Sequence, residues 1–380
     1  MKLTLIAGAR PNFMKIAPII HELNRVKNES GIDFRLVHTG QHYDEKMSET
    51  FFRELNIPEP DVNLGCGGGT QAEQTAAIMV AFEKEMMAHP SDLVVVVGDV
   101  TSTLACSIVA KKLNTKVAHV EAGLRSWDMT MPEEINRIVT DALADYYFTT
   151  TRQAGKNLQQ AGVPDERIFF VGNVMIDTLL VNRPRFKKPM FWDELKLEKE
   201  NYIVMTLHRP ANVDDPQKLW SLLEAITSAS KNVPVIFPVH PRTSKVISQI
   251  NNDYSQAYNF SSTFPGLNLI PPLGYHEFNY LVENAKAVIT DSGGITEETT
   301  VMGVPCMTLR NNTERPETVE MGTNELLGTN PDAIKPAMEK LFADNWKNGS
   351  VPELWDGKAA ERIVKQLISF RIRHFCKYDC

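Results

Sequence analysis

The chain has 380 residues, of which 43% are hydrophobic and 23% charged, and its formal net charge is −7. An acidic balance argues against nucleic acid as a partner, because proteins that bind polyanions usually carry a basic face. No stretch reaches the ~20 apolar residues that span a bilayer, and the apolar start lacks the cleavage site of a signal peptide. We therefore expect a cytoplasmic protein without a membrane partner.

Short apolar runs alternate with amphipathic segments along the first half of the chain. The runs lie at 3–7, 34–38, 93–97 and 117–120. Because they are apolar throughout rather than at every second residue, they predict strands buried on both faces of a parallel sheet. Segments such as 16–26 and 101–113 lie between them and are predicted to be helices, which gives a βα order with right-handed crossovers.

The alternation breaks at 183–200, which is rich in Pro, Lys and Glu and which we interpret as a linker. Apolar runs then resume at 203–207, 233–239, 267–270, 287–290 and 304–309, and an amphipathic helix follows at about 357–373. We predict an α/β protein of two Rossmann-like, doubly wound parallel-sheet domains, residues 1–182 and 200–357. Residues 358–380 form a helix and tail, and the helix can pack back on the first domain. Ligands of such folds bind outside the carboxyl ends of strands, so we expect the site in the interdomain cleft.

The first predicted strand ends at Gly8 and is followed by Arg10 and Lys15 at the start of a helix. Glycine allows a ligand to approach closely, and the first N–H groups of a helix attract anions. The two cations add fixed positive charge. This pattern favours a phosphate site over a simple turn with two solvated cations, although it matches neither common nucleotide-binding glycine motif.

Three carboxylates of the first domain follow strands or begin helices. Asp99 follows an apolar strand and either caps the next helix or faces the site. Glu121 also directly follows an apolar strand, where an unpaired charge is costly, so it either pairs with Arg125 or takes part in chemistry, which we favour. Glu133 lies four residues before Arg137 on one helix face, and alone this spacing is as typical of a surface ion pair.

In the second domain, His208 and Arg209 come at the carboxyl end of the first predicted strand. A lone histidine is more often structural, but the neighbouring arginine and the strand-end position favour a functional role. Arg315 adds another cation near the ends of the same strands.

A strand end, a turn with two glycines and a helix start follow one another at Ser292, Gly293 and Gly294. The serine hydroxyl and the exposed backbone N–H groups make a suitable cradle for a diphosphate. Glu298, one helical turn further on, is placed to accept both hydroxyls of a ribose, with Glu297 as the alternative.

The sequence predicts neither a metal nor a redox cofactor. No pair of residues has the spacing of metal ligands, the fingerprint for nicotinamide dinucleotides is absent, and the five cysteines include no close pair. Carboxylates can remove or return a proton, and cations can stabilise a departing diphosphate. The combination suits chemistry at a sugar carbon next to a nucleotide leaving group.

The motifs at 8–18, 98–103, 119–125, 132–137, 291–298 and 313–317 resemble those of the non-hydrolysing UDP-N-acetylglucosamine 2-epimerases of bacterial and archaeal cell-surface polysaccharide synthesis. The resemblance covers nearly the whole chain. It implies a fold similar to glycosyltransferase-B enzymes, a homodimer, and interconversion of UDP-GlcNAc and UDP-ManNAc. It also implies that UDP is eliminated to give a bound 2-acetamidoglucal and adds back after C2 is reprotonated on the other face.

The resemblance further implies roles for individual residues. Its catalytic positions correspond to Asp99, Glu121, Glu133 and His208, and Arg137 corresponds to an arginine near the substrate. Its UDP-binding positions correspond to Arg10, Lys15, Ser292, Gly293, Gly294, Glu298 and Arg315. The acid that usually follows Arg-Pro in the first motif is Asn12 in this chain.

Four alternatives to this function remain at the level of sequence. A hydrolysing epimerase would release UDP and free ManNAc through the same first half-reaction. A 2-epimerase of the same family type would act instead on a diacetamido uronic-acid version of the nucleotide sugar. A glycosyltransferase would need an acceptor site, of which the sequence gives no sign, and a nucleotide-sugar sensor would not need the three carboxylates.

Overall fold

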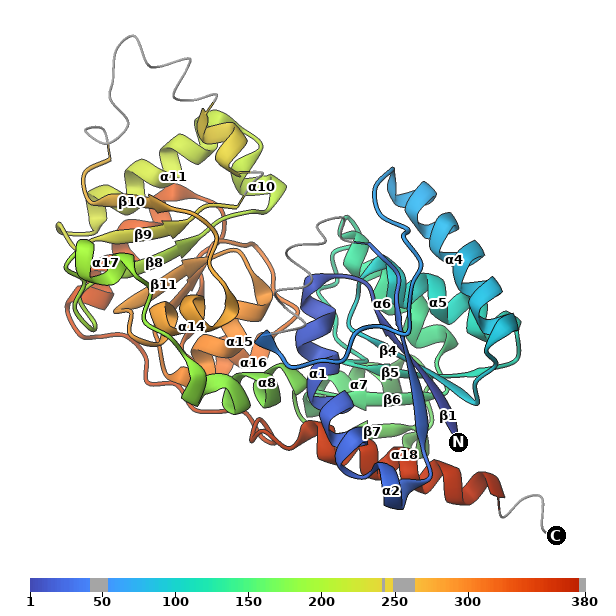
Figure 1. Cartoon of the computed structure of the whole chain (residues 1–380). Coiled ribbons are helices and arrows are strands. Elements are labelled where there is room, and N and C mark those ends of the chain that lie inside the picture. The colour runs from blue at the N-terminus through green and yellow to red at the C-terminus, as the bar shows by residue number, and fades with distance from the viewer. Residues whose placement is uncertain (42–53, 241–242, 249–263, 376–380) are drawn as a thin grey trace. The chain divides into compact units, whose positions relative to one another are not determined.

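The computed structural model describes residues 1–41, 54–240, 243–248 and 264–375, without the side chains of Arg10 and 373–375. The chain forms two compact units (Figure 1). Unit 1 comprises Met1–Asn182 and Glu353–Cys380, and unit 2 comprises Arg183–Pro352. Both units consist of a parallel sheet with helices, as the apolar runs predict. No helix within the described ranges is long and apolar enough to cross a membrane.

Unit 1 contains a seven-stranded sheet of order β3-β2-β1-β4-β5-β6-β7, with every described pair parallel. The strands are β1 (Lys2–Ala7), β2 (Asp33–His38), β3 (Val62–Asn63), β4 (Leu93–Val97), β5 (Lys116–Val120), β6 (Tyr146–Thr149) and β7 (Ile168–Phe170). Strand order reverses between β1 and β4, and such a switch point is where open α/β sheets bind ligands. The motifs after Ala7 and after Val97 therefore begin side by side.

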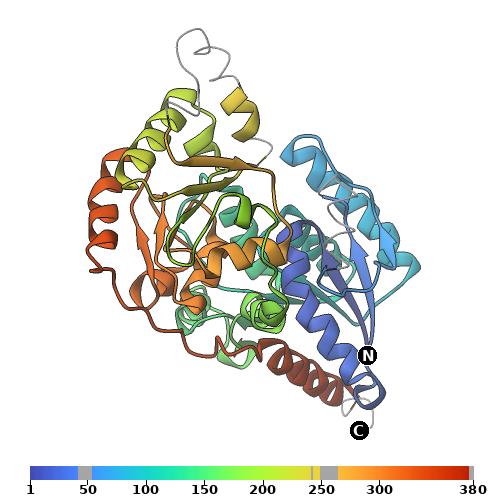
Figure 2. The same ribbon diagram turned by 60° about the vertical axis from the view of Figure 1, so that its left-hand side comes forward.

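Most helices of unit 1 belong to two groups, α4-α5-α6 and α1-α8-α18, whose members contact one another (Figures 1 and 2). The bounds of the helices, with α2 and α7 outside these groups, are α1 (Arg10–Arg25), α2 (Lys27–Ser30), α4 (Gln71–Ala88), α5 (Thr101–Lys112), α6 (Pro132–Leu143), α7 (Arg152–Gln160), α8 (Val174–Asn182) and α18 (Ala359–Phe375). A short 3₁₀ turn, Asp165–Arg167, precedes β7. Covering both faces with helices explains why the strands are apolar throughout.

Unit 2 contains a six-stranded sheet of order β10-β9-β8-β11-β12-β13, again with parallel pairs. Its strands are β8 (Ile203–Thr206), β9 (Val235–Pro238), β10 (Leu267–Ile270), β11 (Ala287–Thr290), β12 (Cys306–Thr308) and β13 (Asn324–Leu326). Its helices are α9 (Phe191–Glu194), α10 (Pro210–Val213), α11 (Pro216–Ala229), α14 (Tyr275–Glu283), α15 (Gly293–Met302), α16 (Pro316–Glu320) and α17 (Ile334–Phe342). The order reverses between β8 and β11, so the segments after Thr206 and after Thr290 share the switch point.

The segment 183–200, predicted to be a linker, belongs instead to unit 2. Trp192 in α9 is buried and packs edge-on against Tyr202 and Tyr280, with ring centroids 5.2 and 5.4 Å apart. Leu197 is buried in the same cluster. The prediction was wrong because the many charged residues and prolines hide a short helix with too few residues to show an apolar period.

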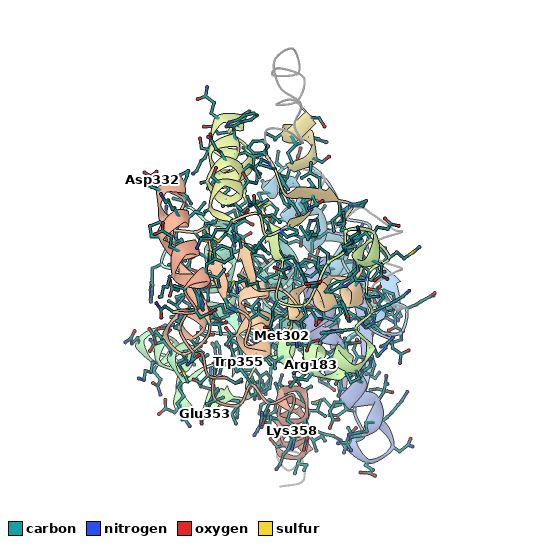
Figure 3. The ribbon with its side chains drawn as sticks, turned by 90° about the vertical axis from the view of Figure 1, so that its left-hand side faces the viewer. Arg183, Met302, Asp332, Glu353, Trp355 and Lys358 are labelled. Atoms are coloured by element: carbon teal, nitrogen blue, oxygen red, sulfur yellow. The ribbon has the colours of Figure 1, made fainter. Side chains whose placement is uncertain are left out.

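After unit 2 the chain returns to unit 1 at Glu353, whose carboxylate accepts two hydrogen bonds from Arg152 at 2.6 and 2.7 Å. Trp355, labelled in Figure 3, is buried and donates its Nε1–H to the carbonyl of Thr150 at 3.2 Å. Further along α18, the ring of Phe370 stacks on that of Tyr146 with centroids 3.9 Å apart. The C-terminal helix is thus part of the core of unit 1.

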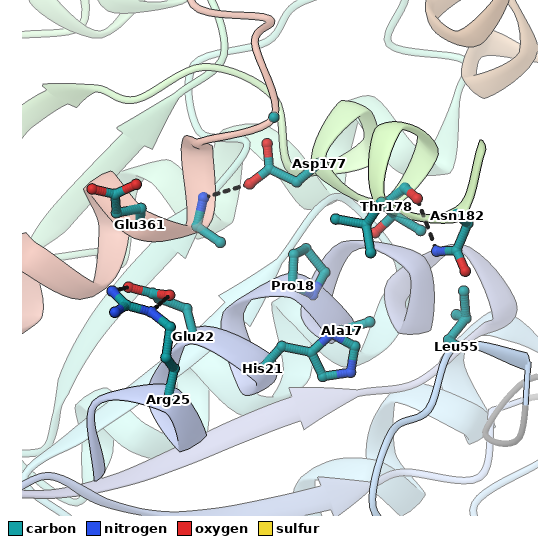
Figure 4. A pocket seen from close by; sticks show the side chains of 13 residues that line it. Ala17, Pro18, His21, Glu22, Arg25, Leu55, Asp177, Thr178, Asn182 and Glu361 are labelled. Atoms are coloured by element: carbon teal, nitrogen blue, oxygen red, sulfur yellow. Dashed lines mark hydrogen bonds and ion pairs between the residues drawn. The ribbon is translucent and has the colours of Figure 1, made fainter. Parts of the chain in front are cut away.

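The N-terminus of α18 is held by a carboxylate from another helix. Asp177 of α8 accepts the backbone N–H groups of Ala359 and Ala360 at 3.1 and 2.7 Å, and Figure 4 shows it pointing to this turn. A hollow of about 230 Å³ lies beside it between α1, α8 and α18 (Figure 4). Burial raises the pKa of Asp177 to about 6, although the two N–H groups oppose the shift.

We expect Asp177→Ala to lower the free energy of unfolding by roughly 1–2 kcal/mol, because it removes a helix cap and leaves two buried N–H groups without an acceptor. Urea denaturation followed by circular dichroism would measure the change. The matched control is Glu361→Ala, which removes an exposed acid from the same helical turn and should change stability by less than about 0.5 kcal/mol. Equal effects of the two substitutions would contradict the capping role.

Candidate active site

The carboxyl ends of β1, β4 and β5 gather several predicted site residues of unit 1. Lys15 of α1 pairs with Glu121, which directly follows β5, and both side chains are buried. Glu121 adopts a φ of 69°, a left-handed conformation that residues other than glycine rarely adopt. The partner expected for Glu121 was Arg125, but Arg125 donates to Asp141 at 2.6 Å instead.

Asp99 is held by α6 and does not cap the next helix, since the N-cap of α5 is Val100. Arg137 is buried, and its Nη1 donates to Oδ2 of Asp99 at 2.5 Å. The side-chain amide of Asn136 donates to the backbone carbonyl of Asp99 at 2.8 Å. The Asp99 side chain is still 26% exposed, so one face of this carboxylate remains open to a ligand.

Glu134, which the sequence analysis missed, is the buried partner of Arg137. Its Oε2 accepts from Nε and Nη2 of Arg137 at 3.0 and 2.8 Å. Its carboxylate also accepts from the backbone N–H groups of Ser126 and Trp127, both at 3.0 Å. Burial alone would raise the pKa of Glu134, but the bonds from Ser126 and Arg137 hold it below its ordinary value. The neighbouring Glu133 is exposed in the first turn of α6.

Asn12 ties the turn after β1 to β4. Its Oδ1 accepts the N–H groups of Gly8 and Ala9 at 3.2 and 3.0 Å, and its Nδ2 donates to the carbonyl of Val97 at 2.7 Å. A carboxylate in this position could not make the last bond, so the amide suits this turn. The side chain of Arg10 lies outside the described residues.

In unit 2, a histidine and an aspartate meet at the switch point. Nδ1 of His208 lies 2.9 Å from Oδ1 of the buried Asp291. Asp291 also accepts the backbone N–H groups of His208 and Arg209, and the amide of Asn212. Burial would raise the pKa of Asp291, but His208 and these donors hold it below its ordinary value. A carboxylate that only accepts places a hydrogen on Nδ1, so the neutral ring carries its lone pair on Nε2.

The His208 side chain is 41% exposed, so its ring is open to a ligand. Arg209 is fixed beside it, because its Nε donates to the carbonyl of Asp291 at 2.9 Å. Asp291 was not singled out from the sequence, although it is the first residue of the glycine-containing turn. Two features of the sequence could have identified Asp291. It directly precedes the glycine-containing turn, and its strand pairs with the strand that precedes His208.

The helix α15 begins with the predicted cradle: Ser292 is its N-cap, and Gly293 and Gly294 are its first residues. The two following acids have different partners. Glu297 forms a buried ion pair with Arg315 at 2.6 Å, and Glu298 accepts from the hydroxyl of Tyr275 at 3.1 Å. Both acids of this helix are thus oriented by a second element.

Each unit therefore carries a group of predicted site residues at the carboxyl ends of its strands. Unit 1 holds Lys15, Asp99, Glu121 and Arg137, and unit 2 holds His208, Arg209, Ser292, Gly293, Gly294, Glu298 and Arg315. In the part of the chain that is described, no group of three histidine, cysteine or acidic side chains is arranged to hold a metal ion.

The sequence model of the UDP-N-acetylglucosamine 2-epimerase family matches residues 24–368 of this chain. A relative from Methanocaldococcus jannaschii, named UDP-N-acetylglucosamine 2-epimerase, is 41% identical over 375 residues, which cover 97% of this chain and 99% of the relative. This chain belongs to the UDP-N-acetylglucosamine 2-epimerase family. It is an enzyme of the 2-epimerase type, as the resemblance of its motifs implies.

Another member of the 2-epimerase family, from Pseudomonas aeruginosa, is 40% identical over 97% of this chain and 99% of its own length. It is named UDP-2,3-diacetamido-2,3-dideoxy-D-glucuronate 2-epimerase. Identity alone therefore does not separate the two sugar specificities, because the relatives that carry these names are almost equally similar to this chain.

The fold of the 2-epimerase family is also found by structural comparison. The crystal structure of the Methanocaldococcus jannaschii enzyme in complex with UDP-GlcNAc and UDP has a TM-score of 0.84 and 42% identity, covering 97% of this chain and 99% of that one. The Neisseria meningitidis enzyme bound to UDP-GlcNAc has a TM-score of 0.83 and 27% identity, covering 97% and 100%. The prediction of two Rossmann-like units of the glycosyltransferase-B type is confirmed.

One buried acid near Arg315 belongs to no predicted group. Glu317 of α16 is buried, and within the described ranges neither of its carboxylate oxygens has a hydrogen-bond partner. Burial raises the pKa of Glu317 to about 6, while the nearby Arg315 opposes the shift. Since the folded-state pKa lies above the unfolded one, this carboxyl adds stability at low pH that is lost as the pH rises through 6.

We expect Glu317→Gln to become more stable relative to the wild type as the pH rises from 4 to 7, by about 2 kcal/mol, because the amide avoids ionisation of a buried group. Urea denaturation at several pH values would measure the difference in unfolding free energy. The exposed Glu320 on the same helix provides the control, as Glu320→Gln should show no such trend. A difference independent of pH would contradict the raised pKa of Glu317.

Proposed function

We propose that this protein interconverts UDP-GlcNAc and UDP-ManNAc by inverting the configuration at C2 of the sugar. The observation that carries the proposal is the presence in unit 1 of two separate carboxylates, Asp99 and Glu121, each bonded to its own cation. Inversion at C2 requires a proton to be removed from one face and supplied from the other. Two acid/base groups held by different elements meet that requirement, whereas binding of a nucleotide alone would not need them.

The reaction we propose begins with loss of the C2 proton to one carboxylate, while the bond between C1 and the UDP oxygen breaks. The products are UDP and 2-acetamidoglucal, both retained by the enzyme. The second acid then protonates C2 on the opposite face, and UDP adds back to C1. Asp99, Glu121 and the exposed Glu133 are the candidates for these proton transfers, and Arg137 orients Asp99.

The groups of unit 2 suit the departing UDP. His208, held by Asp291, can donate a proton to the leaving diphosphate or stabilise its charge, and it can reverse this role when UDP returns. The N–H groups that open α15, with Ser292, would bind the diphosphate. Glu298, oriented by Tyr275, would accept the ribose hydroxyls. Arg10, Lys15, Arg209 and Arg315 would supply positive charge.

We further infer that the enzyme acts in the cytoplasm and as a homodimer. The buried cysteines Cys66, Cys106 and Cys306 are free thiols, which is typical of a reducing compartment. The homodimer follows from the resemblance to the family, and analytical ultracentrifugation would test it.

The test of the proposed function is proton NMR of the purified protein with UDP-GlcNAc in D2O, without added metal or nicotinamide cofactor. We expect UDP-ManNAc to appear with deuterium at C2 and with little free UDP. Release of equal amounts of UDP and ManNAc would identify a hydrolysing epimerase instead. If UDP-GlcNAc remains unchanged but the diacetamido uronic-acid nucleotide is epimerised, the specificity is that of the Pseudomonas aeruginosa relative.

We expect Asp99→Asn and Glu121→Gln to reduce epimerisation at least ~100-fold, because each removes an acid/base group while the amide oxygen can still accept from the neighbouring cation. If the two groups serve opposite faces, one variant should still release 2-acetamidoglucal from UDP-GlcNAc only, and the other from UDP-ManNAc only. Product analysis from each epimer would show this.

The matched control for these variants is Asp145→Asn, which removes a carboxylate paired with Lys111 at the amino end of β6. Its turnover should match that of the wild type. If Asp99→Asn and Glu121→Gln lose elimination from both epimers alike, the assignment of one group to each face is wrong.

A further inference from the structure

A fully buried histidine lies in β5, directly beneath the carboxylates of unit 1. Nδ1 of His119 lies 2.7 Å from Oδ1 of Asp141, and its Nε2 lies 2.9 Å from the backbone carbonyl oxygen of Gly98. A carbonyl oxygen can only accept, so Nε2 carries a hydrogen. A neutral imidazole has just one N–H, which leaves the state of Nδ1 to be decided by Asp141.

Asp141 is surrounded by donors. Its Oδ2 accepts from Nη1 of Arg125 at 2.6 Å and from the backbone N–H of Gly123 at 3.1 Å. Burial would raise the pKa of Asp141, but His119 and Arg125 hold it below its ordinary value. An ionised Asp141 has no hydrogen to give, so Nδ1 of His119 must also be a donor.

We propose that His119 is a positioning residue with a hydrogen on each ring nitrogen, whose two N–H groups fix the ends of β4 and β5 and thereby the acid/base carboxylates Asp99 and Glu121. The inference rests on the proposed function for the role of these carboxylates, while the hydrogens on the ring are inferred from its two acceptors, Asp141 and the carbonyl of Gly98. His119 acts through Gly98 and contacts no substrate in this proposal.

Both backbone polar groups of Gly98 are bound to β5. Its N–H donates to the carbonyl of Val120 at 2.9 Å, and its carbonyl accepts from His119. Gly98 immediately precedes Asp99 and has a φ of 68°, and Glu121 has a similar left-handed backbone. Glycine adopts this conformation freely, whereas for Glu121 it is strained and persists only when neighbouring bonds over-determine it. The second N–H of His119 ties Gly98 to β5, the strand that Glu121 directly follows, at the position where Asp99 leaves the sheet.

The groups around the ring keep Asp141 an acceptor of hydrogen bonds. The ring of His119 and the guanidinium of Arg125 share the single carboxylate of Asp141, and the hydroxyl of Tyr147 on β6 donates to the backbone carbonyl of Asp141 at 2.8 Å. The ion pair of Lys15 and Glu121 lies close to Gly98. A side chain at this position would collide with it, because a Cβ atom built on Gly98 would be 2.9 Å from Nζ of Lys15. Burial of a charge is costly unless it is paired, and Arg125 pairs with Asp141 while Lys15 pairs with Glu121.

The first test is NMR of the full chain labelled with ¹⁵N-histidine, at the pH of the epimerase assay. We expect both ring nitrogens of His119 to be bonded to hydrogen, with the resonances assigned by their loss in His119→Gln. A ring with one nitrogen that carries no hydrogen would overturn the inference. This readout needs no substrate, so it stands apart from the proposed function.

The second test compares His119→Gln with the wild type in the epimerase assay. A glutamine amide cannot donate to Gly98 and Asp141 with the geometry of the ring, so we expect kcat to fall by at least ~10-fold with KM changed less than twofold, and the limbs of the kcat–pH profile to shift. An unchanged kcat and pH profile in a folded variant would overturn the positioning role.

The matched control is His38→Gln, which replaces another buried histidine of unit 1, at the end of β2. Its stability should fall as that of His119→Gln does, as measured by thermal unfolding, but its kcat–pH profile should remain that of the wild type. A shifted profile in both variants would show a general effect of destabilisation and overturn the specific role of His119. If the wild type has no epimerase activity, the proposed function fails while the protonation result remains valid.

Discussion

Pairing of buried ions at the ends of parallel strands is the constraint on which the rest of this structure depends. In unit 1, Arg137 is fully enclosed and must be satisfied by Glu134 and Asp99, and Lys15 must be satisfied by Glu121. Losing one member of such a pair leaves an uncompensated charge in a medium that solvates it poorly. The same bonds that make burial tolerable also fix where each carboxylate points, so the stability of this edge and the geometry of the site have one origin.

Unit 2 solves the same problem with a different set of donors. Asp291 is surrounded by two backbone N–H groups, an amide and an imidazole, and no lysine or arginine side chain neutralises it among the bonds described here. The aspartate thereby orients His208 while the ring remains partly exposed. Both units place this arrangement at the point where strand order reverses, because only there do the segments that follow two adjacent strands diverge and leave room for a ligand.

The strands and the two-unit architecture could be predicted from the sequence, because continuous apolar runs depend on local composition alone. The identities of ion-pair partners could not. Arg125, four residues away, was the partner named for Glu121 in case it formed an ion pair, but Lys15 is brought to it by the β1–α1 turn. The helix period of α6 places both Glu133 and Glu134 near the face of Arg137, so it could not show that Glu134 is the buried partner. The short helix around Trp192 was missed since four residues are too few to reveal a period.

The insertion of unit 2 between residues 182 and 353 has a consequence for biosynthesis. A ribosome releases the N-terminal part of unit 1 first, then the whole of unit 2, and only afterwards the segment that contains Trp355 and α18. Unit 2 is continuous in sequence and can complete its core while translation proceeds. The nascent unit 1 must meanwhile keep the apolar surfaces of α1 and α8 uncovered, with Asp177 lacking the N–H groups of Ala359 and Ala360. Unit 1 can therefore complete its fold only when α18 packs on α1 and α8, after the whole of unit 2 has been synthesised.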